Sequence, residues 1–134
     1  MRSYDVRTAA FAVGVSTKWV DNVLSHHEIP GVERATHGVE RRLPFSALVV
    51  LAVARDLSAE LSIPLRRACE IASKLTASDG DAGSCPVGEN MALTGDLSNL
   101  AADIERRLLE VADLAFRVPR GRPRNVDANT SSAG

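Results

Sequence analysis

The stretch "GVSTKWVDNVLSHHEIPG", residues 14–31, decides how the first half of the chain folds. Gly14 follows the short apolar stretch 8–13, and a glycine just past a helix accepts the left-handed backbone conformation that ends it. Ser16 is a favoured N-cap, so a second helix is predicted over about 17–27. The apolar face of this second helix would hold Val20, Val23, Leu24 and His27.

Two short helices joined by a turn that contains glycine form a helix-turn-helix, whose second helix can enter a DNA major groove. The polar residues of the second predicted helix are Thr17, Lys18, Asp21 and Asn22. Asparagine can pair with adenine, lysine can donate to guanine, and aspartate can accept from cytosine. These residues therefore form a candidate DNA-reading face, and the alternative is the solvated face of a small core helix.

A small β-hairpin is predicted from the sequence that follows, "EIPGVERATHGVERRLPF", residues 28–45. Extended pieces at 32–34 and 39–43 flank a turn at 36–38, where glycine supplies the positive φ that a tight turn requires. Basic side chains here would bind DNA phosphates together with Lys18, with an affinity that falls as salt is added. The DNA-binding residues expected in this hairpin are Arg34, His37, Arg41 and Arg42.

Two further helices complete the expected N-terminal domain, residues 1–75. The stretch "FSALVVLAVARDLSAEL", residues 45–61, is apolar almost all round, which predicts a deeply buried helix. Ser62 and Pro64 then begin another helix, because proline suits the first helical turn. The outward residues of that helix would be Arg66, Arg67 and Lys74.

This order of elements resembles the MerR-type winged helix-turn-helix DNA-binding domain. The resemblance is carried by "GVSTKWVDNVL" (14–24), "THGVERRLPFSAL" (36–48) and "LSIPLRRACEIA" (61–72), and it covers about residues 5–75. It implies a mainly α fold with a two-stranded wing, in a protein that binds double-stranded DNA. Excisionase-type domains of mobile elements share the turn and the "EIP" string, and are the competing resemblance.

The composition changes after Leu75, where "TASDGDAGSCPVGEN" is rich in Gly, Ser, Asp and Pro, and this predicts a flexible or irregular linker over 76–96. A helix is then predicted over 97–117, because its apolar residues follow the 4, 3, 4, 3, 4 spacing of a coiled-coil seam. MerR-like regulators dimerise through a C-terminal helix, so the resemblance implies a homodimer. The expected dimerisation residues are Leu97, Ile104, Leu108 and Val111. The alternative is that this helix packs back on its own domain.

The tail contains a second informative string, "VPRGRPRNV", residues 118–126. Its core resembles an AT-hook, in which an extended Arg-Gly-Arg-Pro segment lies in the narrow minor groove of A·T-rich DNA. The residues that would make this contact are Arg120, Gly121, Arg122 and Arg124. The alternative is a disordered basic tail over 118–134 that adds only non-specific attraction.

Charge is distributed unevenly along the 134 residues, although the formal net charge is only −1. Residues 1–74 carry ten Lys and Arg against eight Asp and Glu, and residues 117–134 carry four against one. Residues 75–116 carry two against eight. The middle section would therefore not lie on a polyanion, whereas the two flanking sections can.

The sequence favours neither a membrane or secreted protein, nor a metal-binding protein, nor an enzyme. No apolar run reaches the ~18 residues that span a bilayer, and residues 1–10 lack the apolar stretch of a signal peptide. We therefore expect a cytoplasmic protein with no membrane partner, associated with the nucleoid when bound to DNA. Cys69 and Cys85 have no paired spacing, and the three histidines have no metal-ligand spacing. With no nucleophile–base pair or glycine-rich phosphate loop, neither an enzyme nor a cofactor is expected.

Two functions fit these features. The first is a sequence-specific transcription regulator of the prokaryotic type, acting as a homodimer on double-stranded DNA. The alternative is an antitoxin or a phage or mobile-element accessory factor, of the excisionase or repressor type, whose acidic C-terminal helix binds a partner protein.

Overall fold

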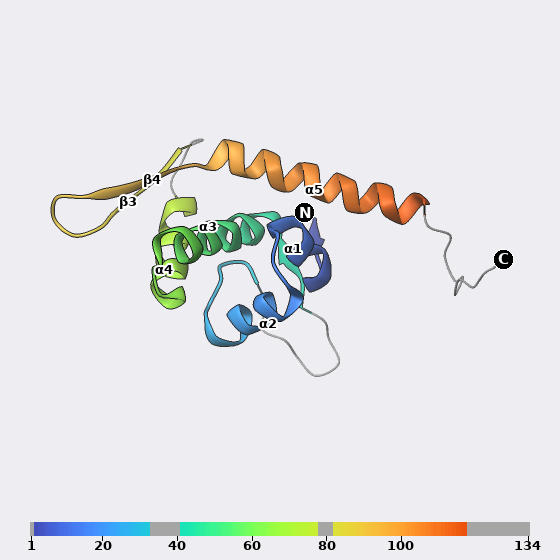
Figure 1. Ribbon diagram of the computed structural model, residues 1–134, viewed down its shortest axis with the longest axis horizontal. Coiled ribbons are helices and arrows are strands. Elements are labelled where there is room, and N and C mark those ends of the chain that lie inside the picture. Colours follow the sequence, from blue (N-terminus) through green and yellow to red (C-terminus); the bar gives the residue numbers. More distant parts are fainter. Residues whose placement is uncertain (1, 33–40, 78–81, 118–134) are drawn as a thin grey trace.

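The chain folds into a helical head, residues 2–32 and 41–77, and an arm, residues 82–117, that lies across the head (Figure 1). The computed structural model describes residues 2–32, 41–77 and 82–117. Within these residues the head holds four helices and a two-stranded sheet, and the arm holds a second two-stranded sheet followed by one long helix. The predicted mainly α fold is confirmed.

Helix α1, Val6–Val13, begins earlier than predicted because an acidic side chain caps it. The Asp5 carboxylate accepts a hydrogen bond from the backbone N–H of Thr8 at 2.8 Å, which satisfies one of the free donors of the first turn. The helix ends at Gly14, which has φ 85°, as the glycine signal predicted.

Helix α2, Thr17–His26, has the predicted start and the predicted buried face. Ser16 caps it, because its Oγ accepts from the backbone N–H of Trp19 at 3.0 Å. Val20 and Val23 are fully buried in the core of the head. Two short helices joined by a glycine turn are therefore present.

Helix α3, Phe45–Leu61, runs through the middle of the head, and residues 47–54 are all buried. This confirms the expectation of a deeply buried helix, because an apolar surface on every side can be satisfied only in the core. Helix α4, Leu65–Ala77, is amphipathic and packs against α3. Arg66, Arg67 and Lys74 are on its exposed face, as predicted.

The head has a short sheet that joins its N-terminus to the start of α3. Strand β1, Ser3–Tyr4, pairs antiparallel with strand β2, Leu43–Pro44. The hairpin pattern predicts that Leu43 pairs with residues 32–34, whereas in the structure Leu43 pairs with Tyr4. The rest of that predicted wing, residues 33–40 with Arg34 and His37, lies outside the described residues.

The expectation of an irregular linker over 76–96 is wrong for most of its length. Strand β3, Ala82–Pro86, pairs antiparallel with strand β4, Ala92–Asp96, and Figure 1 shows this hairpin extending beyond the helices. The backbone N–H of Val87 donates to the carbonyl of Met91 at 2.8 Å and closes the hairpin. Its glycines and proline therefore belong to strands and a turn rather than to a linker.

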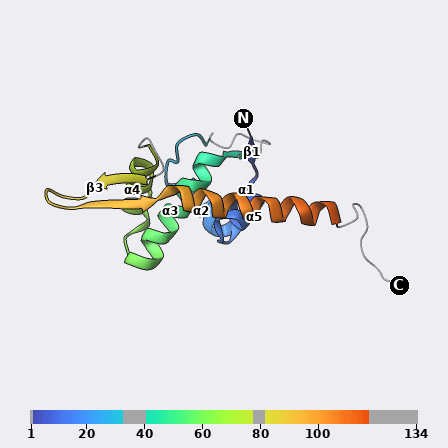
Figure 2. The ribbon, with the colours of Figure 1, turned by 90° about the horizontal axis from the view of Figure 1, so that it is seen from above.

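Helix α5, Leu97–Arg117, has the bounds predicted from its apolar spacing. It begins at Asp96, whose carboxylate accepts from the backbone N–H of Asn99 at 3.0 Å. It lies on the side of α3 opposite α2 (Figure 1), and the view from above shows it crossing the head from the hairpin towards the C-terminus (Figure 2).

The apolar seam of α5 covers the head of its own chain. Ile104 is 2% exposed, and Leu97 and Leu108 are partly buried against the same core. Three of the four residues expected to dimerise are thus used within the chain, and Val111 is half-buried. This is the arrangement in which the helix packs back on its own domain. Within the described residues, no helix is long and apolar enough to cross a membrane.

Candidate nucleic-acid interface

The reading face of α2, which we define as Thr17, Lys18, Asp21 and Asn22, is exposed at all four positions. Its backbone is held by the buried residues Val20 and Val23 on the opposite side of the helix. Trp19 is half-buried against the core. The structure therefore presents the predicted polar residues together on one fixed helix face.

These four side chains make no hydrogen bond or ion pair with any described residue. Lys18 and Asp21 are in particular not engaged with each other, although both are exposed on the same face. A lysine and an asparagine without internal partners can donate to base edges without breaking an existing contact. The reading face is therefore chemically suited to a polar ligand such as the edge of a base pair.

Arg42 has a structural contact that sequence reasoning missed. Its Nη2 donates to the backbone carbonyl of Ser3 at 2.9 Å, and its Nε donates to the Ser3 Oγ at 3.2 Å. The pKa of Asp5 is lowered by its hydrogen bonds from Thr8 and, to a smaller extent, by the charge of Arg42. Arg42 thus connects strand β1 to the start of strand β2. Arg41, by contrast, is half-buried and has no polar partner among the described residues.

A groove lies between the C-terminal end of α2 and helix α4, with a volume of about 660 Å³. We call it the basic groove; its lining residues are His26, His27, Glu28, Arg66, Arg67, Cys69, Glu70, Ser73 and Lys74. Helical spacing predicts the outward position of the α4 cations but does not bring them together with the histidines. Their proximity depends on how α2 crosses α4, which no local sequence signal reports.

The basic groove contains one buried thiol and one exposed ion pair. Burial raises the pKa of the Cys69 thiol to about 11, so this group stays neutral at physiological pH. Arg67 and Glu70 are 3.3 Å apart, and both side chains are about half exposed. An exposed pair of this kind contributes little to stability and can exchange for another partner.

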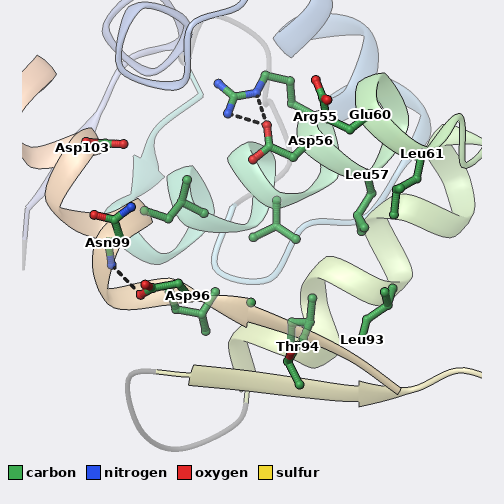
Figure 3. Close-up of a pocket in the computed structure, with 15 residues that line it drawn as sticks. Arg55, Asp56, Leu57, Glu60, Leu61, Leu93, Thr94, Asp96, Asn99 and Asp103 are labelled. Carbon is green, nitrogen blue, oxygen red and sulfur yellow. Dashed lines mark hydrogen bonds and ion pairs between the residues drawn. The ribbon is translucent and has the colours of Figure 1, made fainter. Parts of the chain in front are cut away.

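A second cavity, of about 530 Å³, lies between the arm and the head. Four carboxylates line it, and Figure 3 labels them: Asp56, Glu60, Asp96 and Asp103. Arg55 also lines it and is paired with the first of these carboxylates at 2.7 Å. We call it the acidic cavity. Its negative charge would repel a polyanion, so this side of the molecule is not suited to nucleic acid.

The remaining expected DNA-binding residues are in the tail. Arg120, Gly121, Arg122 and Arg124 lie outside the described residues, as does the whole of 118–134. Residues 2–32, 41–77 and 82–117 contain no group of three His, Cys, Asp or Glu side chains placed to hold a metal ion.

No protein-family model, curated protein or solved structure matches this chain. A function for it is therefore inferred from its own residues and their arrangement.

Proposed function

We propose that the chain is a sequence-specific double-stranded DNA-binding protein that regulates transcription, and that α2 is its reading helix. The observation that carries this proposal is the reading face, where four polar side chains without partners among the described residues are exposed on a helix anchored by Val20 and Val23. A helix of this kind fits the width of a DNA major groove.

Each residue of the reading face has a role that follows from its chemistry. Asn22 can make a paired contact with adenine, and Lys18 can donate to guanine or to a phosphate. Thr17, in the first turn of α2, can contact either the DNA backbone or a base edge. Asp21 can accept from a cytosine amino group, and it disfavours guanine at that position because it would face the two acceptors of that base.

Phosphate contacts would come from the basic residues around this helix. Arg41, at the end of the predicted wing, has no polar partner in the described part of the chain, and Arg34 is the second candidate from the sequence. The cations of the basic groove lie at the C-terminal end of the same helix. Contacts of this kind fix the protein on the duplex and make the affinity depend on salt.

A homodimer is part of the proposal, because one short helix reads too few base pairs for specificity. The face of α5 that covers its own head is occupied, so a second copy would bind elsewhere on the arm. Leu109 is 71% exposed on α5 and is a large apolar side chain available for such a contact. The arginines of the tail would add a minor-groove contact.

A second function is favoured by the apolar side chains that the arm exposes. Met91, at the closing end of the hairpin, is 73% exposed, and it adds to Leu109. An antitoxin or a mobile-element accessory factor would use this acidic and partly apolar arm to bind a partner protein. Its DNA binding would then serve autoregulation or assembly.

The proposal is tested by fluorescence anisotropy with the DNA upstream of the gene, random duplex as competitor and a series of salt concentrations. Lys18→Ala should weaken binding and give a shallower salt dependence, because a cation near the duplex is lost. Arg106→Ala, on the exposed face of α5, is the matched control and should bind as the wild type does. Equal binding by all three proteins would contradict the proposal.

A further inference from the structure

We propose that the basic groove is a binding site for phosphate groups, and that protonation of His26 and His27 raises its affinity for them. Where the phosphate belongs to DNA, this inference rests on the function proposed above and adds a pH dependence to it. The groove would bind a free phosphate by the same contacts. The experiment below separates the two sources of phosphate.

The cations of the groove come from two helices that are distant in sequence. His26 and His27 end α2, Glu28 follows them, and α4 supplies Arg66, Arg67, Glu70 and Lys74 across the groove. Cys69 lies in the wall and is buried. Among the described residues, these are all the titratable and charged side chains that line the groove.

The charge of the groove depends on its two histidines. Three cations, Arg66, Arg67 and Lys74, stand against two carboxylates, Glu28 and Glu70. With both histidines neutral the net charge is +1, and with both protonated it is +3. Histidine is the side chain that ordinarily changes charge between about pH 5 and about pH 8.

The geometry of His26 shows which atom takes up the proton. Its Nδ1 is 2.9 Å from the backbone carbonyl of Asn22, and because a carbonyl only accepts, Nδ1 carries a hydrogen. The second proton therefore binds at Nε2. The ring lies in the last turn of α2.

The two histidines are close enough to influence each other. Their ring centroids are 6.5 Å apart, so two imidazolium rings repel, and an anion bound beside them offsets that repulsion. Proton binding and anion binding then favour each other to the same extent, as linkage requires. Phosphate binding by the groove should therefore be accompanied by proton uptake.

Phosphate suits the chemistry of this groove. Arg66 is exposed and has no polar partner among the described residues, and guanidinium binds the oxygens of phosphate in pairs. A tetrahedral oxyanion has several oxygens that can accept from donors on more than one side. His26 follows Asn22 by one helical turn, ~6 Å along α2, so a phosphate in the groove lies beside the reading face.

The first arm of the test uses a short DNA duplex, whose charge does not change between about pH 7.5 and about pH 5.5. Affinity is measured by anisotropy at both values for the full chain, for His26→Gln/His27→Gln, and for Arg106→Ala. Arg106 is exposed on α5, away from the groove, so the last variant controls for a substitution that leaves both groove histidines in place. Circular dichroism at each pH checks that every variant is folded.

The wild type and Arg106→Ala should bind DNA roughly tenfold more tightly at the lower pH, and the double variant less than about twofold more tightly. A gain that persists in the double variant, or no gain in the wild type, would overturn the pH dependence. The Arg66→Gln variant should weaken binding at both pH values.

The second arm uses inorganic sulfate, a tetrahedral dianion whose charge is constant over this range, with the histidine ring protons followed by NMR. Sulfate should shift the His26 and His27 signals, more strongly at the lower pH, and leave His37 unchanged. If DNA does not bind at any pH but sulfate shifts the His26 and His27 signals as expected, the proposed function is wrong and the groove is still supported as a phosphate-binding site. If DNA binds without any pH dependence and sulfate shifts nothing, the groove fails and the proposed function stands.

Discussion

The guanidinium of Arg42 donates to the backbone carbonyl of Ser3 at 2.9 Å. This contact joins strand β1 to the start of strand β2, which directly precedes α3. This contact changes the role expected for Arg42. A basic residue at the base of the predicted wing was expected to bind phosphate. In the structure two of its three guanidinium nitrogens are already engaged with one serine.

We expect Arg42→Ala to lower the free energy of unfolding by about 0.5–1 kcal/mol, because exposed hydrogen bonds between β1 and β2 are lost. Arg41→Ala, the neighbouring substitution, should leave stability unchanged and act on DNA affinity alone. Urea denaturation of both variants compares them directly. Equal stability of the two would show that the Ser3 contact does not hold the sheet.

Asp5 gives a prediction about pH. Its pKa is lowered from 3.8 in the folded state, mainly by the hydrogen bonds from Thr8, so its contribution to stability is complete above that value and is lost as the pH falls through the lower folded value. Asp5→Ala should therefore cost about 1 kcal/mol at neutral pH and progressively less in acid, as for other N-caps.

The measurement for Asp5 is urea denaturation at neutral and at acid pH, with Asp21→Ala as the control. Asp21 is exposed and makes no polar contact with a described residue, so its removal should not alter unfolding at either pH. A difference between wild type and Asp5→Ala that grows in acid would contradict the assignment of the cap.

Gly83 and Gly95 face each other in the hairpin and provide a matched pair. A Cβ on Gly83 would overlap the backbone carbonyl of Leu75, whereas a Cβ on Gly95 would be in ordinary contact with Leu97, at 3.8 Å. Gly83→Ala should therefore destabilise the attachment of the hairpin to α4 by at least ~1 kcal/mol, and Gly95→Ala should be tolerated. Hydrogen exchange of the hairpin amides compares the two, and equal protection would contradict this attachment.

Ile104 and Leu109 separate the two uses of α5. Ile104→Ala should lower the free energy of unfolding by about 2–4 kcal/mol, because a buried side chain is replaced by a cavity in the chain's own core. Leu109→Ala should leave the unfolding of the monomer within about 0.5 kcal/mol, because the side chain is exposed, and should weaken self-association instead. Denaturation and sedimentation equilibrium distinguish these effects. Self-association lost in Ile104→Ala, with stability kept, would contradict this assignment.

Much of the head could be predicted from local signals. Ser16 and Gly14 mark helix ends through hydrogen bonds and backbone conformation that depend on one or two neighbours. The apolar run of α3 requires burial whatever surrounds it. The bounds of α5 likewise followed from its apolar spacing. The spacing did not show that the apolar face of α5 covers the head of its own chain.

The features that were missed depend on contacts between distant segments. Glycine, serine and proline in residues 82–96 are equally frequent in linkers and in tight hairpins, and the close approach of Gly83 to Leu75 decides between them. Arg42 meets Ser3 only because β1 pairs with β2. The basic groove likewise exists because α2 ends beside α4, so its histidines and arginines carry no shared sequence signal.

The central claim is that α2 reads base sequence, and the most direct test is selection of bound duplexes from a random pool. The wild type, Asn22→Ala and the control Asn90→Ala, on the exposed hairpin, are compared. The account predicts one preferred sequence for the wild type and the control, and loss of preference at one or two positions for Asn22→Ala, at about 1–3 kcal/mol for each lost base contact. An unchanged preference in Asn22→Ala, or no preferred sequence for the wild type, would contradict it.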